Sequence, residues 1–275
     1  MNKKPLLPVK SDFVFKLIFG DQRNADILSS FLMAVLDIPE DEYDRLTIID
    51  PHVKKESKDD KFSILDVKLH TKTGKIVHIE IQISPIPEMK ERSIFQQSKM
   101  ITEQMAAGRD WSSIKRVISI IITDYDLIPE NKKYHHQFRY RTIDGIGYTD
   151  LTEINTLELS KLPQTADDSE LWFWMKFIKS DDEEALNMIA EKNPQMRKAV
   201  GILKELSADE RTRMLLEAQE THRKDVASMI GGARREGLQE GRHLVVQNAL
   251  DMGLDIETIS KLTGLTHEEI ENLKS

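Results

Sequence analysis

Residues 62–83 read FSILDVKLHTKTGKIVHIEIQI, with apolar and polar side chains alternating on both sides of a short polar segment. Successive side chains of a β-strand point to opposite faces, so this alternation predicts two strands, over residues 62–69 and 76–83. The segment between them, residues 71–75, contains Gly74 and has the composition of a turn. We therefore predict an antiparallel hairpin whose apolar face packs on the core.

A turn centred on Thr73 sets the register of this hairpin and places Asp66 directly opposite Glu80, with Cβ atoms about 4.5–5.5 Å apart. Facing carboxylates repel each other unless a cation compensates, and hard divalent ions prefer carboxylate oxygens as ligands. The same face carries further polar side chains, namely Lys68, His78 and Gln82. The alternative is a solvent-facing strand on which the basic neighbours neutralise the acids. The spacing alone leaves both interpretations open.

The rest of the chain up to residue 162 alternates between helical and strand patterns. We expect helices over residues 12–19, 24–36 and 91–107, a buried central strand over 117–123, and further strands over 134–142 and 156–159. After Pro163 the patterns are helical, over residues 171–178, 183–191, 197–206 and 208–230. The chain is therefore expected to form an α/β domain over residues 1–162, a helical domain over 163–232 and a helical tail over 233–275.

The tail has a composition of its own. Glu-Gly pairs repeat at residues 236–237 and 240–241, and apolar residues on both sides of Gly264 predict two small helices, a helix-turn-helix-like end. Acidic residues outnumber basic ones in this end, whereas a protein that reads the DNA major groove needs the opposite balance. A tail that docks a partner or forms a dimer is therefore favoured over a DNA reader.

The composition of the chain limits which metal ligands and which cellular location it can have. A chain of 275 residues with 39% hydrophobic content can bury a full core, where we expect Trp111, Trp172 and Trp174. The lack of cysteine excludes disulfides and thiolate zinc sites and leaves oxygen and nitrogen ligands, which favour magnesium or manganese. The longest apolar run, residues 117–122, is too short to cross a bilayer, and residues 1–5 lack the apolar segment of a signal peptide, so we expect a cytoplasmic protein.

The net charge of −8 argues against broad coating of nucleic acid, because phosphate contacts need a local excess of cations. The best local cluster of positive charge is residues 132–141, where basic and aromatic side chains are interspersed and no acidic residue occurs. The candidate nucleic-acid contacts in this cluster are Lys132, Lys133, Arg139 and Arg141. A solvated strand face explains the same pattern, and both interpretations stay open.

The order of these elements, with Asp66 followed by Glu80-Ile81-Gln82 and then by a helix, resembles the PD-(D/E)XK nuclease core, a restriction-endonuclease-like α/β fold with a mixed sheet flanked by helices. More narrowly, the chain is similar to the Rpn family of recombination-promoting nucleases and transposases. The matching stretches are SDFVFKLIFG at residues 11–20, LDVK at 65–68, HIEIQ at 78–82, LELSK at 157–161, and the Glu-Gly repeat followed by ISKLTGL at 259–265.

This resemblance implies a magnesium ion, with manganese as a substitute, held by Asp66, Glu80 and the main-chain carbonyl of Ile81. Gln82 stands where the wider superfamily usually has lysine, although the Rpn family shares the glutamine. A glutamine orients a water molecule but supplies no charge to the developing phosphorane. Lys68, on the same predicted face, is a candidate for part of that charge.

Asp12 resembles the acidic residue that the first helix of this core often presents near the metal. Its alternative role is that of a helix N-cap. Lys16, one turn later, is expected to pair with Asp12 or with a phosphate.

The function implied by the resemblance is a metal-dependent DNA endonuclease that hydrolyses phosphodiester bonds, linked to recombination, mobile elements or defence. The alternative is a catalytically weak or inactive DNA-binding or assembly protein that retains the nuclease fold, with Gln82 as its signature. Because cutting both strands of a duplex often needs two active sites, a homodimer through the C-terminal helices is compatible with the first function.

Overall fold

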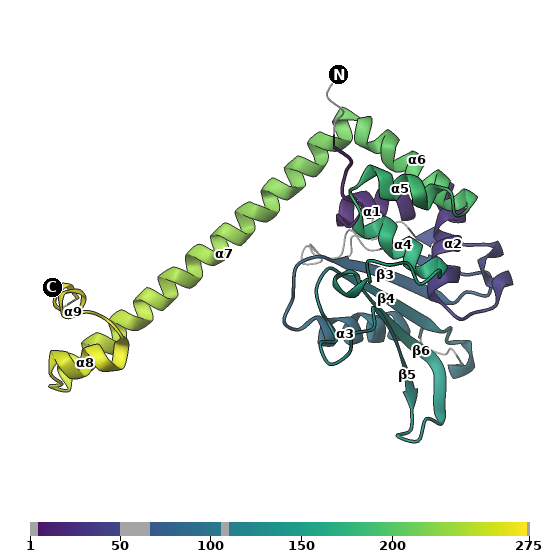
Figure 1. The fold of residues 1–275 in the computed structure, drawn as a ribbon. Helices are drawn as coiled ribbons and strands as arrows, with labels where there is room; N and C mark the ends of the chain where they lie inside the picture. The colour runs from purple at the N-terminus through teal and green to yellow at the C-terminus, as the bar shows by residue number, and fades with distance from the viewer. Residues whose placement is uncertain (1–4, 50–66, 106–109, 274–275) are drawn as a thin grey trace. The chain divides into compact units, whose positions relative to one another are not determined.

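A computed structural model describes residues 5–49, 67–105 and 110–273 of the chain. The chain divides into two compact units, Met1–Arg213 and Met214–Ser275. The first unit contains all the strands of the described residues, and the second contains helices (Figure 1).

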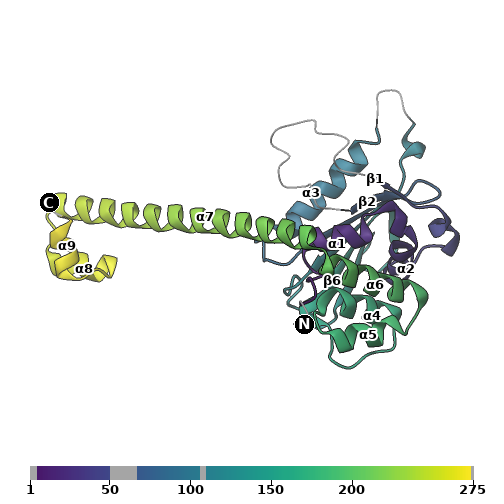
Figure 2. The ribbon, with the colours of Figure 1, turned by 90° about the horizontal axis from the view of Figure 1, so that it is seen from above.

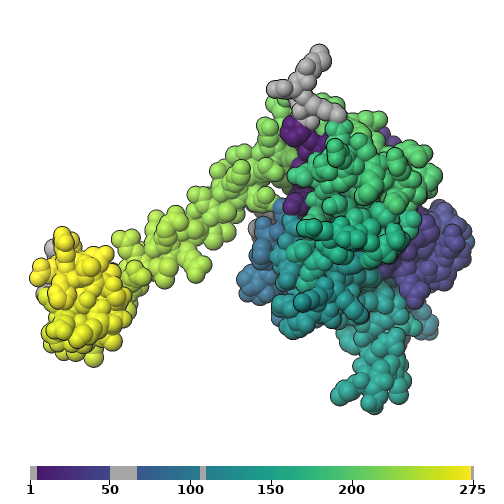
Figure 3. Space-filling view, in the orientation of Figure 1, coloured from purple at the N-terminus to yellow at the C-terminus, as the bar shows by residue number. Residues whose placement is uncertain are grey.

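A mixed six-stranded sheet forms the centre of the first unit, in the order β1-β2-β3-β4-β6-β5. Its strands are β1 (Thr47–Ile49), β2 (Val67–His70), β3 (Ile76–Gln82), β4 (Val117–Thr123), β5 (His135–Arg141) and β6 (Gly147–Glu158). Strands β3, β4 and β6 run parallel to one another, whereas β1, β2 and β5 pair antiparallel with their neighbours. The outer part of the β5–β6 hairpin protrudes from the body of this unit (Figure 3).

Helices cover both faces of the sheet. One face carries α3 (Met89–Thr102), and the other carries α1 (Asp12–Phe19), α2 (Ala25–Val35), α4 (Glu170–Lys179), α5 (Glu183–Ala190) and α6 (Pro194–Ala208) (Figures 1 and 2). Three of these helices, α1, α2 and α4, meet through stacked and edge-on aromatic rings of Phe15, Phe19, Phe31, Trp174 and Phe177. All five of these rings are buried, so the main core lies between these helices and the sheet.

The predicted hairpin register is confirmed for the described residues. Val67 pairs with Ile79 and Lys68 with His78, as a turn centred on Thr73 requires. Gly74 has a φ of 86°, a left-handed conformation that favours glycine in this turn. The expected pairing of Asp66 with Glu80 involves residue 66, which lies outside the described residues.

The solvent-facing alternative for this hairpin is wrong at its centre. Strand β3 is an inner strand rather than an edge, because β4 pairs along its whole length. Helix α3 lies on the polar face, so His78 and Glu80 are buried. The burial of this polar face arises from the helix that follows the hairpin, which the alternation within the hairpin does not reveal.

Several element bounds differ from expectation. The strand expected over residues 156–159 begins at Gly147, because β6 pairs with β4 on one side and β5 on the other. The helix expected over residues 208–230 is part of α7 (Glu210–Asp251).

Trp172 and Trp174 are buried as expected, but Trp111 is 78% exposed in a short 3-10 turn between α3 and β4. Helices α4 to α6 belong to the same compact unit as the sheet, and a separate domain over residues 163–232 stays a prediction.

The second unit consists of most of α7 together with α8 (Ile256–Thr263) and α9 (His267–Asn272). Val246, Ala249, Ile259 and Ile270 form its small core. Gly264 ends α8 with a φ of 69°, where a residue with a side chain would be strained. Two short helices on either side of this glycine were expected. Among the residues that the structure describes, no helix combines the length and the apolar character that crossing a membrane needs.

Candidate active site

Glu80 is a buried carboxylate near the carboxyl end of the inner strand β3. Its side chain is 3% exposed, and its Oε1 lies 3.0 Å from Nη2 of Arg92 on α3. The first turn of α3 is held over the sheet because Met89 is buried against Ile121 and Leu127. A buried carboxylate stays ionised only when cations or donors compensate the lost hydration. The packing of α3 therefore places a positive charge where Glu80 needs one.

The parallel strands align polar side chains in rows on the α3 face. Glu80 pairs with Ile121 of β4, and two residues further along β3, Gln82 pairs with Thr123. Thr123 in turn pairs with Glu158 of β6. Side chains two residues apart on a strand share a face, so Gln82, Thr123 and Glu158 form a row beside Glu80 at the carboxyl ends of three strands.

The segment before α1 is tied to this same edge of the sheet. Lys10 Nζ lies 2.6 Å from Oδ2 of Asp124, the residue that directly follows β4. Two residues later, Asp12 opens α1, which contacts β3. Ser11 occupies the N-cap position, and Oδ1 of Asp12 accepts a hydrogen bond from the N–H of Phe13 at 2.7 Å. Asp12 is thus close to the strand ends, while its role near a metal stays a prediction.

Tyr125 packs against the cluster of Met89, Ile121 and Leu127, on the α3 face of the sheet. Burial, followed by the charges of Glu80 and Glu158, raises the pKa of its hydroxyl above the ordinary value, so it stays protonated at neutral pH. Glu158 itself is fully buried and accepts hydrogen bonds from the N–H groups of Leu127 at 2.8 Å and Ile128 at 3.1 Å. Its Oε2 also lies 2.7 Å from Lys161 Nζ. These contacts of Glu158 hold the loop that follows β4 against the end of β6.

Three further predicted site residues in the described part of the chain are Gln82, Lys68 and Lys16. The Gln82 side chain is half-buried, and its Nε2 donates to the carbonyl of Ser84 at 2.9 Å. Lys68 Nζ lies 3.5 Å from Oε2 of Glu103, at the far end of α3. Lys16 is half-buried in α1. Asp66, the second predicted carboxylate ligand, lies outside the described residues.

The basic cluster of residues 132–141 divides into two parts. Arg139 Nε lies 2.7 Å from Oε2 of Glu153, a carboxylate that also pairs with Arg116. Burial raises the pKa of Glu153, but hydrogen bonds from Asn155 and Arg139 and the charge of Arg116 outweigh it and lower the pKa. Lys132, Lys133 and Arg141 are exposed. Of these three, Arg141 donates from Nη1 to the carbonyl of Gly145 at 3.0 Å, whereas Arg139 is held by its ion pair with Glu153.

The candidate metal ligands among the described residues are of the chemical type that a hard divalent ion prefers. Glu80 supplies a carboxylate and Ile81 a main-chain carbonyl, and both are oxygen donors of the type that magnesium and manganese prefer. Within residues 5–49, 67–105 and 110–273, no group of three or more His, Asp or Glu side chains is placed to hold an ion. Asp66, the remaining predicted ligand, lies outside the described residues.

Arg92 and Tyr125 are the residues near Glu80 that sequence reasoning missed. A helix that follows the carboxyl end of a parallel strand crosses back over the sheet, so its first turn lies near that end. Helix α3 buries Met89, Ser93, Gln97 and Met100. The spacing of these residues identifies its inner face and places Arg92 at its margin. Few of them are strongly apolar, and so the pattern is weak in the sequence.

Comparison with protein-family models identifies the first unit. A model described as PD-(D/E)XK nuclease family transposase matches residues 9–233, which is most of the chain. The chain belongs to this family. The mixed sheet flanked by helices is the fold expected of a PD-(D/E)XK nuclease, and the predicted resemblance is confirmed. Comparisons with curated proteins and with solved structures found no match.

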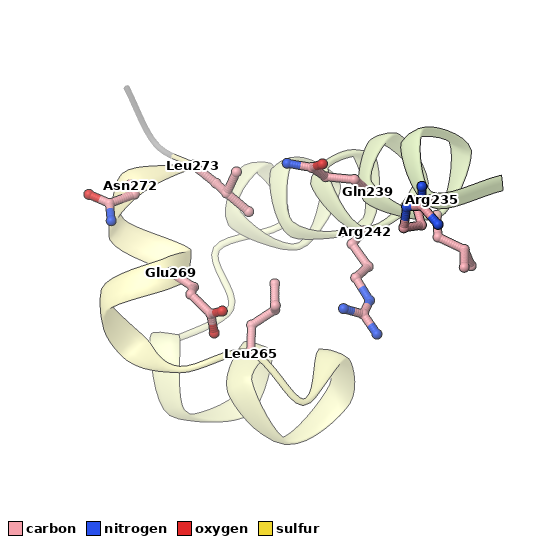
Figure 4. A pocket seen from close by; sticks show the side chains of 8 residues that line it. Arg235, Gln239, Arg242, Leu265, Glu269, Asn272 and Leu273 are labelled. Atoms are coloured by element: carbon pink, nitrogen blue, oxygen red, sulfur yellow. The ribbon is translucent and has the colours of Figure 1, made fainter. Parts of the chain in front are cut away.

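A second family model, described as the C-terminal HTH domain of the Rpn/YhgA-like nuclease family, matches residues 247–275. It covers the end of α7 together with α8 and α9. Helix α7, the connection between α8 and α9, and α9 with the residue after it border a pocket of about 530 Å³, lined by Arg235, Leu238, Gln239, Arg242, Leu265, Glu269, Asn272 and Leu273 (Figure 4). In the described part of this match, the acidic residues Asp251, Asp255, Glu257, Glu268, Glu269 and Glu271 are exposed. This helix-turn-helix domain thus has an acidic surface.

Proposed function

We propose that this PD-(D/E)XK family member is a metal-dependent endonuclease that hydrolyses DNA phosphodiester bonds. Asp66, Glu80 and the Ile81 carbonyl would hold magnesium, with manganese as a substitute. The observation that carries the proposal is the position of Glu80, a buried carboxylate on an inner strand beside the aligned carboxyl ends of β3, β4 and β6. Burial of a carboxylate costs folding free energy, and a functional role is one reason for a chain to retain it.

The chain's own residues would orient the reaction. A bound divalent ion lowers the pKa of a coordinated water and polarises a phosphodiester oxygen. Gln82 would position the attacking water through its side-chain amide, and Asp12 would approach from α1, which contacts β3. The exposed cations Lys132, Lys133 and Arg141 would contact the phosphate backbone. We expect weak, salt-sensitive DNA binding, because the chain as a whole is acidic.

The C-terminal unit would supply a dimer interface. Along α7, Val226, Ile230 and Leu244 are exposed apolar side chains. Gly237 and Gly241 lie four residues apart on the same helix, and a Cβ added at either would meet no other atom of the chain within 4 Å. Small residues at this spacing allow a second helix to approach closely. A homodimer would place two sites on one duplex, and cutting both strands of a duplex often needs two active sites.

Plasmid cleavage tests this proposal. Purified protein is incubated with supercoiled plasmid in magnesium or manganese, alongside Glu80→Gln and Asp66→Asn. Loss of a metal ligand is expected to lower nicking by about 10²-fold or more, because the charge of the transition state loses its stabilisation. Glu184→Gln, which changes an exposed carboxylate on α5, is the matched control and should cleave like the wild type.

Two results would count against the proposal. Equal nicking by the wild type and both ligand variants would mean a contaminant or a different site. Plasmid binding without nicking in either metal would favour the catalytically weak or inactive DNA-binding or assembly protein, for which Gln82 in place of lysine is the supporting observation.

A further inference from the structure

The proposed nuclease site lacks the lysine that usually follows the glutamate ligand, and the structure contains another cation nearby. We propose that Arg92 binds the scissile phosphate and supplies the positive charge that Gln82 does not. Its guanidinium lies 3.0 Å from Glu80, and its side chain is 29% exposed. The inference rests on the proposed nuclease function, and it names the residue that would recognise the substrate's phosphate.

Gln82 is poorly suited to stabilise a phosphorane. Its amide is neutral, and its Nε2 already donates to the carbonyl of Ser84 at 2.9 Å. Attack on a phosphodiester adds negative charge to the phosphate oxygens, which preorganised cations stabilise most effectively. The site therefore needs a charged donor in addition to Gln82.

Lys68 is less well placed than Arg92. It pairs in the sheet with His78, which lies two residues further from the carboxyl end of β3 than Glu80 does. Its ammonium lies 3.5 Å from Glu103, which follows the last residue of α3. Arg92, in contrast, contacts Glu80 directly from the first turn of the same helix. The two cations thus lie toward opposite ends of α3, and Arg92 is at the site.

Arginine has the chemistry for this role. A guanidinium stays charged at any physiological pH and presents five N–H donors in a planar fork that matches phosphate oxygens. The contact with Glu80 uses one nitrogen of that fork, Nη2, and the partial exposure of the side chain leaves a path from solvent. Arg92 therefore has donors to offer a phosphate without leaving Glu80.

Helix α3 holds Arg92 in position before substrate arrives. Met89, three residues earlier, is fully buried against β4, and Gln97 donates to the main-chain carbonyl of Glu153 at 2.8 Å. Tyr125 packs against the same cluster as Met89, which lies in the first turn of α3 with Arg92. A donor fixed in this way contributes more to catalysis than one that must be ordered during the reaction.

The contact also predicts competition for Glu80. A guanidinium and a divalent ion that share one carboxylate repel each other, so Arg92 should weaken metal binding in the protein without DNA. A phosphate that binds Arg92 brings negative charge and removes this repulsion. Metal and substrate should therefore bind cooperatively, and Arg92 should carry the coupling.

The test measures binding of manganese alone by calorimetry, without DNA, together with plasmid cleavage. Arg92→Gln should bind Mn²⁺ tighter than the wild type, by roughly tenfold, while cleaving about 10²-fold more slowly. Arg92→Lys keeps the charge but loses the fork, so it should bind Mn²⁺ like the wild type and cleave at an intermediate rate. Lys99→Gln, the same charge change on an exposed position of α3, should alter neither quantity.

A purely structural ion pair would behave differently. In that case Arg92→Gln would bind Mn²⁺ more tightly, because Glu80 is freed, but would cleave plasmid as fast as the wild type, and this result would overturn the inference while leaving the nuclease proposal intact. If Arg92→Gln does not fold, wild-type cleavage by a well-folded Arg92→Lys would also overturn it. A wild type that neither binds Mn²⁺ nor cleaves would instead remove the proposed function itself, and the role of Arg92 with it.

Discussion

The two compact units of this chain bury their side chains to very different extents. In the first unit, Phe19, Phe31 and Trp174 are fully buried between helices and a six-stranded sheet. In the second, the core consists of four buried residues, and most of α7 is exposed. Buried apolar area is the main source of folding free energy. The first unit therefore has a large core of its own, whereas the second depends more on helix propensity and on what binds its exposed faces.

The largest expected effect is the loss of a core ring in the first unit. Trp174→Ala should lower the free energy of unfolding of that unit by about 3–5 kcal/mol, because it leaves a cavity among the aromatic rings. Urea unfolding followed by far-UV circular dichroism should show an earlier transition for the first unit only. Ile259→Ala, in the core of the second unit, is the matched change and should move only the other transition. One shared transition for both variants would mean that the units unfold together.

The second-largest expected effect is a difference in acid sensitivity between the two units, caused by a contact in the first unit. Burial raises the pKa of Glu42, but hydrogen bonds from Lys75, Thr71 and Thr73 outweigh it and lower the pKa from 4.5 to about 2. Because the folded pKa is depressed, the stabilisation is complete above pH 4.5 and is lost as the pH falls toward 2. We expect a loss of about 3 kcal/mol in the first unit.

Urea titrations across this pH range would measure the loss, and Glu42→Gln should remove most of the pH dependence. In the second unit, hydrogen bonds from Thr258 lower the pKa of Asp255, but this helix cap is exposed and its contribution should be small. Equal acid sensitivity of the two units would contradict this assignment.

The smallest expected effect concerns the glycines of α7. Gly237→Ala should stabilise the helix by about 1 kcal/mol, because an added Cβ has open space and alanine has the higher helix propensity. If the proposed homodimer packs on this face, the same change should weaken self-association in analytical ultracentrifugation. Gly201→Ala in α6, also with open space, should stabilise the first unit similarly without any change in association. Unchanged association of Gly237→Ala would exclude a close helix contact there.

Local sequence patterns predicted much of the fold. The helix over residues 12–19 and the strand over 117–123 have the expected bounds, because periodicity and a helix-ending glycine are local signals. The hairpin register followed from the turn at Thr73 for the same reason. Strand β6 was predicted too short and Trp111 was wrongly expected in the core, since strand pairing and burial depend on distant parts of the chain.

The candidate site divides in the same way. Sequence alone identified Glu80 and Gln82 on one face of a hairpin, because alternation in a strand is a property of neighbouring residues. Only the tertiary structure decided that Glu80 is buried, that Arg92 contacts it, and that Glu158 aligns with Gln82 through Thr123. These relations join residues that are far apart in the chain. They exist because α3 packs on parallel strands whose carboxyl ends meet at one edge, an arrangement that no local pattern specifies.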